Sequence, residues 1–285
     1  MRRVLFACLL VALAAVPALA ADPAPYTDPV LGIRFLPLEG GCFEMGDTFL
    51  DGEADEKPAH EICLSDVFMA AKEVSVRQFQ QFVAETGYVT EAEHKGYCYV
   101  RTEVGKMARA EGARWSMPGF VQTLDHPVVC VTAADATAFA AWLTQKTGRA
   151  MRLPTEAEWE FACRAGGRQI EYGTYTGDMS HEQANLRDTG GRDKWGFTAP
   201  TGSFPPNPAG FNDMSGNVAE WVADAYAADA YARHTPRDPL HPGTGDHVKR
   251  GGSFAMPMAG QRCANRGSNP MASDDIGFRL VLEPK

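Results

Sequence analysis

The chain has 285 residues and a formal net charge of −9, and 45% of its residues are hydrophobic, which is typical of a globular protein. Its lysines and arginines are scattered without a basic cluster, so the sequence lacks the electrostatic footprint of a protein that binds nucleic acid. Glycine (28) and proline (19) are abundant and evenly spread, which predicts many turns and much irregular backbone.

Residues 1–20 are typical of an export signal peptide. Arg2 and Arg3 supply its charged region, residues 4–16 its apolar stretch, and Ala18-Leu19-Ala20 a small-residue cleavage site. The apolar stretch is shorter than the roughly 20 residues that a membrane-spanning helix needs, and no other segment is long and apolar enough. We therefore expect a periplasmic protein with no transmembrane segment after signal removal. We also expect residues 21–285 to form a single domain and the protein to be a monomer.

Six cysteines follow the predicted signal. An even number in an oxidising compartment favours disulfides over free thiols, and fifteen pairings are possible from the count alone. Wide spacing without a C-x-x-C pair argues against a structural zinc site. The six are Cys42, Cys63, Cys98, Cys130, Cys163 and Cys263.

Capping residues and apolar periodicity predict three short helices. The first two run from Ser75 to Gly87 and from Thr132 to Gly148, with a capping residue at one end and a glycine at the other. The third opens with Pro154-Thr155-Glu156-Ala157-Glu158, where Thr155 and Glu158 have capping-box spacing. All three are amphipathic, so we expect each to cover the core with one face.

Short strand-like runs bounded by turn residues lie between and after these helices. They are Phe43–Gly46, Ile62–Ala71, His126–Val131, Lys249–Phe254 and Gly277–Leu282. Residues 168–248 show neither the helical nor the strand period. So long a stretch without regular structure is unusual in a compact domain unless metal ions or functional loops order it.

Several short motifs follow one another along the chain, and three of them are specific in combination: R-L-P-T-E-A-E-W-E, G-N-x-x-E-W, and R-G-G-S followed by G-F-R. The full series is Gly41–Gly46, Asp55–His60, Lys72–Ser75, His126–Val128, Arg152–Glu160, Gly216–Trp221, Arg250–Ser253 and Ile276–Arg279. In this order the motifs resemble the formylglycine-generating enzyme (sulfatase-modifying factor) superfamily. The resemblance implies an α+β, C-type-lectin-like fold of small twisted sheets, peripheral helices and long calcium-ordered loops.

The resemblance also implies two structural Ca²⁺ sites built from side-chain and main-chain oxygens, which are the donors that this hard cation prefers. The matching positions are Asn185, Leu186, Asp193 and Trp195 for the first site, and Asp213, Gly216, Val218 and Glu220 for the second.

The resemblance pairs Cys163 with Cys263. Cys42 and Cys63 lie on two strand-like runs that flank an acidic, turn-rich loop, where a cross-strand bridge is reasonable. This leaves Cys98 with Cys130.

The segment that carries the family's chemistry departs from the family pattern. The true enzyme binds Cu(I) through two cysteines after G-G-S and uses O₂ to convert a substrate cysteine into formylglycine. Here Met256 stands at the first of these positions and the second falls in a shortened stretch, so we do not expect copper. Met256 and Met258 are soft enough to act as thioether ligands, although methionines more often fill irregular apolar gaps. Ser253 and Trp115 match pocket positions of the family, and with Met256 they are the candidate catalytic residues.

These features favour an oxidoreductase-type tailoring or maturation enzyme that uses a non-copper variant of the family cleft on a small-molecule or peptide substrate. The chain resembles the family's pyoverdine-maturation branch, which is exported, similar in length and without the copper cysteines, so siderophore maturation is one example. The alternative is a non-catalytic, lectin-like module that binds a peptide, a glycan or a partner protein. A genuine formylglycine-generating oxidase is a third interpretation, with the right family and the wrong residues.

Overall fold

The computed structural model describes residues 24–102 and 106–285. The predicted signal peptide therefore lies outside the described residues. Within these two ranges, no helix is long and apolar enough to cross a membrane.

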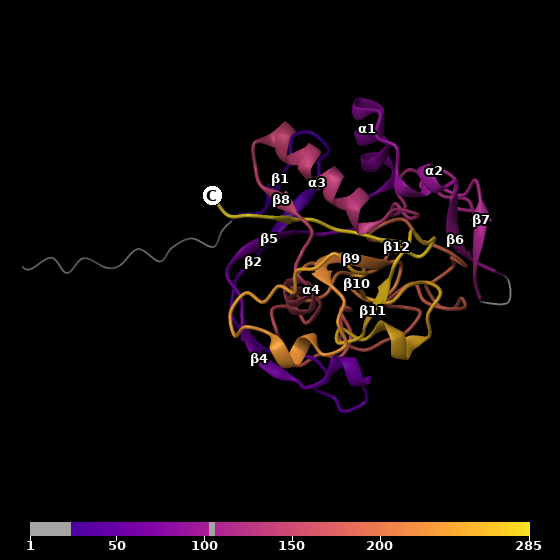
Figure 1. Ribbon diagram of the computed structural model, residues 1–285. Coiled ribbons are helices and arrows are strands. Elements are labelled where there is room, and N and C mark those ends of the chain that lie inside the picture. Colours follow the sequence, from indigo (N-terminus) through magenta and orange to yellow (C-terminus); the bar gives the residue numbers. More distant parts are fainter. Residues whose placement is uncertain (1–23, 103–105) are drawn as a thin grey trace, which may run out of the picture.

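Two small sheets and two separate hairpins carry the strands (Figure 1). The first sheet has the antiparallel order β1 (Tyr26–Thr27), β2 (Arg34–Leu38), β5 (Val67–Ala70), β13 (Val281–Leu282), β8 (Met151–Arg152). The second has the order β11 (Arg266–Asn269), β10 (His247–Arg250), β9 (Ala219–Ala225), β12 (Ile276–Gly277), with β12 parallel to β9. The hairpins are β3 (Cys42–Met45) with β4 (His60–Cys63), and β6 (Tyr97–Arg101) with β7 (Met107–Glu111).

The three predicted helices are confirmed, and their caps explain their ends. They are α1 (Val76–Thr86), α3 (Ala133–Thr147) and α4 (Glu156–Cys163), each with a complete capping box at its N-terminus. Gly87 and Gly148 end the first two in the left-handed conformation. The sequence analysis missed α2 (Glu91–Lys95), because five residues are too short to show a period although Thr90 caps them in the same way.

Three short 3₁₀ turns complete the regular elements: η1 (Ala54–Glu56), η2 (Ala230–Arg233) and η3 (Met258–Gln261). The α+β class with small sheets and few helices is confirmed. Figure 1 shows α1, α2 and α3 at one end of the molecule and the β3–β4 hairpin at the opposite end.

The strand prediction is only partly confirmed. The expected strand at residues 126–131 is wrong: Pro127 makes one isolated bridge with Ser75, and Cys130 has a φ of 56°. Proline has no N–H to extend a ladder, and a left-handed residue turns the chain out of the strand direction.

The strand expected at Phe43–Gly46 is present as β3, shifted by one residue, and the remaining expected strands are shorter than predicted. Residues 62–71 divide into β4 and β5 because the Ser65 N–H and hydroxyl both bind the Asp238 carboxylate, which draws the chain out of the strand direction. β10 ends at Arg250, since Gly251 has a φ of 93°. In the range 277–282, Gly277 ends β12 and residues 281–282 form β13, which lies in a different sheet.

Residues 168–248 are largely irregular, as predicted, but they contain β9, η2 and the start of β10. β9 was missed because it is buried on both faces, so its sequence shows no alternation of apolar and polar residues.

Two apolar clusters form most of the core. One packs the helices α1 and α3 against the C-terminal strands, with Phe79, Phe139 and Phe278 at its centre. The other packs α4 against β3, β5 and β10 around Trp159 and Met214. A smaller cluster surrounds the Cys98–Cys130 bridge.

Candidate functional site

The segment after β10 makes a tight turn that only glycine allows. Gly251 and Gly252 both have positive φ, at 93° and 65°. A Cβ on Gly252 would lie 2.3 Å from the Gln261 side-chain oxygen and 2.5 Å from the Gly260 carbonyl. The amide of Gln261 donates to the Ser253 carbonyl at 2.8 Å and to the Met256 carbonyl at 3.0 Å, so the turn is held closed from inside.

This turn places Ser253 in a buried polar network. Its hydroxyl donates to Asp275 Oδ2 at 3.0 Å, and the Ser273 hydroxyl donates to Oδ1 of the same carboxylate at 2.6 Å. The Arg101 guanidinium lies 3.5 Å from Asp275 Oδ2. Ser253 and Ser273 are fully buried and Asp275 is 4% exposed. The Asp275 side chain is therefore held by two hydroxyl donors and a nearby guanidinium.

Asp274 lies beside this network and has a different environment. Its Oδ2 accepts the Arg101 backbone N–H at 2.9 Å, and its Oδ1 is buried without a hydrogen-bond partner in the described part of the chain. Burial raises the pKa of Asp274 to about 7, and the neighbouring charge of Asp275 acts in the same direction. A carboxyl with this pKa can donate or accept a proton near neutral pH.

The sequence analysis missed Asp274 and Asp275. The available signal was their position directly before the Ile276-Gly277-Phe278-Arg279 motif, which carries them to the turn at Ser253 through the parallel pairing of β12 with β9.

Apolar surface adjoins the network. Phe254, next to Ser253, contacts Phe120 and Phe197, whose rings are stacked 4.5 Å apart. Phe197 is 43% exposed, so this aromatic group reaches the surface.

The other candidate catalytic residues lie in less polar surroundings. Met256 is half-buried and its side chain covers Gly260, while Met258 is 43% exposed. Trp115 is buried in the aromatic core, 5.4 Å from the Phe79 ring. A pocket role for Trp115 and Met256 stays a prediction.

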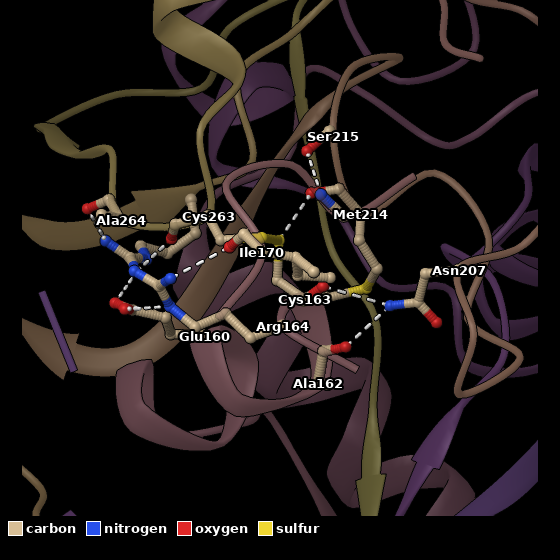
Figure 2. Close-up of a disulfide and its surroundings, with 12 residues drawn as sticks. Glu160, Ala162, Cys163, Arg164, Ile170, Asn207, Met214, Ser215, Cys263 and Ala264 are labelled. Carbon is tan, nitrogen blue, oxygen red and sulfur yellow. Dashed lines mark hydrogen bonds and ion pairs between the residues drawn. A yellow bond between two sulfur atoms is a disulfide. The ribbon is translucent and has the colours of Figure 1, made fainter. Parts of the chain in front are cut away.

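The three predicted disulfides are present. Cys42 pairs with Cys63, Cys98 with Cys130, and Cys163 with Cys263. Figure 2 shows the last bridge beneath the carbonyl of Met214, fixing the end of α4 to the chain that follows the Ser253 turn. Every cysteine of the described residues is therefore in a disulfide.

The first predicted calcium set comes together in the loop that follows residue 184. The Asn185 amide donates to the Phe197 carbonyl at 2.8 Å, and its Oδ1 is buried without a hydrogen-bond partner among the described residues. The buried Asp193 carboxylate accepts the N–H groups of Leu186 (3.1 Å) and Trp195 (3.2 Å). A buried amide oxygen without a donor, close in the chain to a buried carboxylate, fits a hard cation such as Ca²⁺.

The second set differs, because Glu220 already has a cationic partner. The Arg279 guanidinium donates to both Glu220 oxygens at 2.7 Å. Asp213 is buried, and burial raises the pKa of its carboxyl. Gly216 and Val218 lie between the two carboxylates in the chain. Glu220 is thus an ion-pair partner of Arg279, and its role as a calcium ligand stays a prediction.

Glu73 is a further buried carboxyl beside this second set, and the sequence analysis missed it. Its Oε1 accepts the Asn217 amide at 2.9 Å, and its Oε2 has no hydrogen-bond partner in the described residues. Burial, followed by the charge of Asp213, raises the pKa of Glu73 well above its usual range. The signal was its place in the Lys72-Glu73-Val74-Ser75 motif.

Throughout residues 24–102 and 106–285, no three His, Cys, Asp or Glu side chains are arranged to hold a metal, so both calcium sets depend on amide and carbonyl oxygens.

The fold agrees with the comparisons to known proteins. The model of the sulfatase-modifying factor enzyme 1-like domain matches residues 25–284, so the chain belongs to this family.

Among its relatives, the formylglycine-generating enzyme of Thermomonospora curvata is 36% identical over 87% of this chain and 92% of its own. The formylglycine-generating enzyme of Bos taurus is 32% identical over 93% of this chain and 78% of its own. Among solved structures, PvdO from Pseudomonas aeruginosa superposes with a TM-score of 0.77 at 28% identity, covering 93% of this chain and all of that one.

Proposed function

We propose that this protein is an exported tailoring enzyme of the oxidoreductase type, which acts on a small molecule or peptide at the Ser253 turn without copper. The observation that carries the proposal is the buried contact of Ser253 with Asp275, on the same segment that carries the family's chemistry. Burying a carboxylate is costly, so the hydrogen bond of the buried Asp275 to Ser253, with the buried Asp274 next to it in the chain, supports a chemical role for this segment.

The residues of this segment do not fit a Cu(I) centre of the family type. Such a centre needs two thiolates, and a sulfur tied in a disulfide is not a thiolate donor. Cys263 is bonded to Cys163, and Met256 offers only a thioether.

What the chain itself can supply is orientation and proton transfer. Ser253 and Ser273 hold Asp275 in one orientation, and Asp274 can exchange a proton near neutral pH because its pKa is about 7. The exposed face of Phe197 offers an apolar contact for a substrate. An electron acceptor such as O₂ must come from outside the chain. The resemblance to the pyoverdine-maturation branch and the fold likeness to PvdO support a siderophore precursor as the substrate class.

A metabolite comparison tests this function. We expect a strain without the gene to accumulate a precursor, and wild-type protein to restore the product. Ser253→Ala and Asp275→Asn should lower the product at least about tenfold, because positioned proton transfer contributes at least this much to a rate. Met258→Leu, which changes an exposed side chain on the same segment, should restore the product fully. Identical metabolite profiles with and without the gene would favour the non-catalytic binding module.

A peptide assay tests the loss of the parent chemistry. The purified protein, supplied with copper and oxygen, should leave the cysteine of a Cys-x-Pro-x-Arg peptide unchanged by mass spectrometry. Met256→Cys alone should not create activity, since the second ligand is still missing. Robust conversion by the unmodified protein would contradict the absence of copper chemistry.

Export is part of the proposal, and the three disulfides support it, because such bonds persist in oxidising compartments. N-terminal sequencing of the protein from a periplasmic extract should begin near Ala21. A mature protein that starts at Met1 would contradict export.

We further propose that Asn185 and Asp193 hold a structural Ca²⁺ together with main-chain oxygens at Leu186 and Trp195. A chelator should lower the melting temperature of the purified protein, and added Ca²⁺ should restore it. Asn185→Ala should melt at the same temperature with and without the chelator. If the wild-type protein neither contains calcium by metal analysis nor responds to chelation, the calcium site does not exist.

A further inference from the structure

A cavity of about 830 Å³ is lined by none of the candidate catalytic residues. Three segments that are distant in the sequence surround it: residues 31–36, residues 71–78 with Asp125, and residues 201–212. This volume lies within the range of about 300–1,000 Å³ that is usual for small-molecule sites.

One wall is held in place by a buried aspartate. Asp28, 1% exposed, accepts three backbone N–H groups: those of Val30 (2.9 Å), Leu31 (2.8 Å) and Ile33 (2.6 Å). Gly32 completes this turn with a φ of 68°. The wall is therefore rigid before any ligand arrives.

The facing wall is held by a buried asparagine in the same manner. Asn207, 3% exposed, donates to the carbonyls of Ala162 (2.8 Å) and Cys163 (3.2 Å), as Figure 2 shows. Its Oδ1 accepts the N–H groups of Ala209 (3.0 Å) and Phe211 (3.1 Å). The proline-rich loop around Asn207 (residues 205–211) is thereby anchored to α4 and to the Cys163–Cys263 bridge. Because both walls are preformed, a ligand need not spend binding energy on ordering them.

The cavity lining combines aliphatic side chains with polar and charged ones. Its apolar lining includes Leu31, Ile33, Leu36, Pro206, Pro208 and Ala209, and no aromatic side chain is among its lining residues.

Two cations at this cavity form no direct ion pair, although the charge of Lys72 acts on the buried carboxyl of Asp213. Within the described ranges, no carboxylate lies within ion-pair distance of Arg34 or Lys72, whose ammonium donates only to the Thr201 carbonyl at 3.1 Å. The third cation, Arg77, is already paired with Asp125 at 3.0 Å. The remaining acidic lining residue, Glu73, turns its carboxyl inward to the Asn217 amide. Two cations without a direct ion pair at one partly apolar cavity stand out in a chain with a net charge of −9.

We propose that this cavity is a binding site for a small aliphatic carboxylate, with the hydrocarbon part between the two anchored walls and the carboxylate at Arg34 and Lys72. The site is separate from the Ser253 turn, so it can exist whether or not the proposed tailoring activity does.

Isothermal titration of the purified mature protein with decanoate, kept below its micelle concentration, tests the site. We expect decanoate to bind at least about tenfold more tightly than acetate, which carries the charge without the chain. Decyltrimethylammonium, which carries the chain with the opposite charge, should not bind. Arg34→Gln and Lys72→Gln should each weaken decanoate binding about tenfold, because each removes a charged partner of the carboxylate.

Lys106→Gln is the matched control, since it removes an exposed lysine that does not line the cavity. It should leave the affinity unchanged. Arg34 and Lys72 are both exposed, so their variants should fold, and equal melting temperatures would verify this. The proposal fails if the cation of equal chain length binds as well as decanoate, or if both charge variants bind like the wild type. It also fails if a hexaglutamate peptide binds and decanoate does not, because the groove would then belong to an acidic peptide.

Discussion

The two ends of this molecule differ in the side chains that fill their interiors. At the helical end, aromatic rings fill the core: Phe79 stacks on Phe139 at 5.9 Å, and Phe82, Trp142 and Phe278 pack at their edges. The backbone there satisfies its own hydrogen bonds within α1 and α3. The side chains are therefore free to be apolar.

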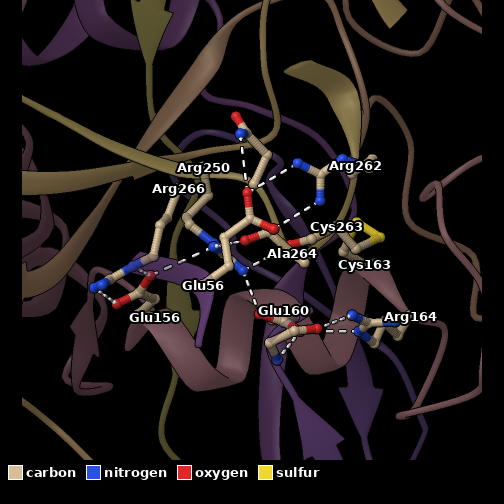
Figure 3. Close-up of polar contacts among 12 residues, drawn as sticks. Glu56, Glu156, Glu160, Cys163, Arg164, Arg250, Arg262, Cys263, Ala264 and Arg266 are labelled. Carbon is tan, nitrogen blue, oxygen red and sulfur yellow. Dashed lines mark hydrogen bonds and ion pairs between the residues drawn. A yellow bond between two sulfur atoms is a disulfide. The ribbon is translucent and has the colours of Figure 1, made fainter. Parts of the chain in front are cut away.

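At the loop-rich end, a buried network of arginines and glutamates takes the place of part of the apolar core (Figure 3). Arg250, fully buried, pairs with Glu160 and donates to the carbonyls of Ala264 (2.7 Å) and Cys263 (2.6 Å). Arg164 and Arg266 behave alike, each with one buried glutamate and two backbone carbonyls as partners.

The difference follows from the backbone. Irregular loops leave carbonyl groups without partners in a ladder, and each buried carbonyl without a donor costs free energy. A guanidinium has five N–H donors in a fixed fork, so one arginine can satisfy a glutamate and two carbonyls together. In this part of the fold, arginine side chains supply the hydrogen bonds to backbone carbonyls that β-ladders and helices supply elsewhere.

The largest effect should come from the bridge that ties the loop-rich end together. Replacing both Cys163 and Cys263 by alanine should lower the free energy of unfolding by about 4–5 kcal/mol, since the bridge closes a loop of roughly 100 residues. Replacing Cys42 and Cys63, which are 21 residues apart, should cost less. Urea unfolding of the two double variants measures both, and the reverse order would contradict the chain-entropy argument.

At the aromatic end, the loss of one ring should lower the stability through lost packing, without a contribution from charge. Phe139→Ala should cost about 3–5 kcal/mol, because it opens a cavity among rings that are fully buried. The loss should be independent of salt and of pH between 5 and 8. A salt-dependent loss would show that charge also stabilises this end.

At the ionic end, the stability effects of two mutations in one ion pair should depend on each other. Arg250→Met should cost about 3–5 kcal/mol, since it leaves Glu160 and Glu156 with too few cations in a buried site. Adding Glu160→Gln should recover part of that loss in a double-mutant cycle. Arg77→Met, which breaks an exposed pair with Asp125, should cost less than about 1 kcal/mol. If Arg250→Met cost as little as this control, the buried network would not stabilise the fold.

The smallest effect concerns Asp274. Its carboxyl takes part neither in the aromatic packing nor in the arginine–glutamate network, and its pKa is raised. The folded pKa of about 7 exceeds that of an unfolded aspartate, so the stabilisation is complete below about pH 4 and is lost as the pH rises through 7. Between pH 6 and pH 7 the wild type should lose about 1 kcal/mol more than Asp274→Asn. Parallel stability curves for the two proteins would contradict the raised pKa.

The family and the three helices could be predicted from local sequence, because capping boxes and motifs are set by residues a few positions apart. The bridges were also predictable, with Cys163–Cys263 coming from the family pattern. β9 could not be predicted, since burial on both faces removes its alternation. The strand expected at residues 126–131 failed because Pro127 and the left-handed Cys130 prevent a ladder.

In the candidate site, too, the sequence predicts what depends on residue type but not which distant residues meet. The sequence identified Ser253 and the loss of the copper cysteines, which are matters of residue type at a motif position. It did not identify Asp275 as the partner of Ser253, which is 22 positions away in the chain. It also did not show that Arg279 donates to both oxygens of Glu220.

The sequence by itself therefore determined the local conformations, the family and the residues absent from the catalytic segment, because these depend on neighbours in the chain. Only the tertiary structure decided which buried charges meet, which carboxyl keeps a proton and where two rigid walls enclose a cavity. Those outcomes depend on burial and on distances between residues that the chain separates by tens to hundreds of positions, and no local pattern encodes them.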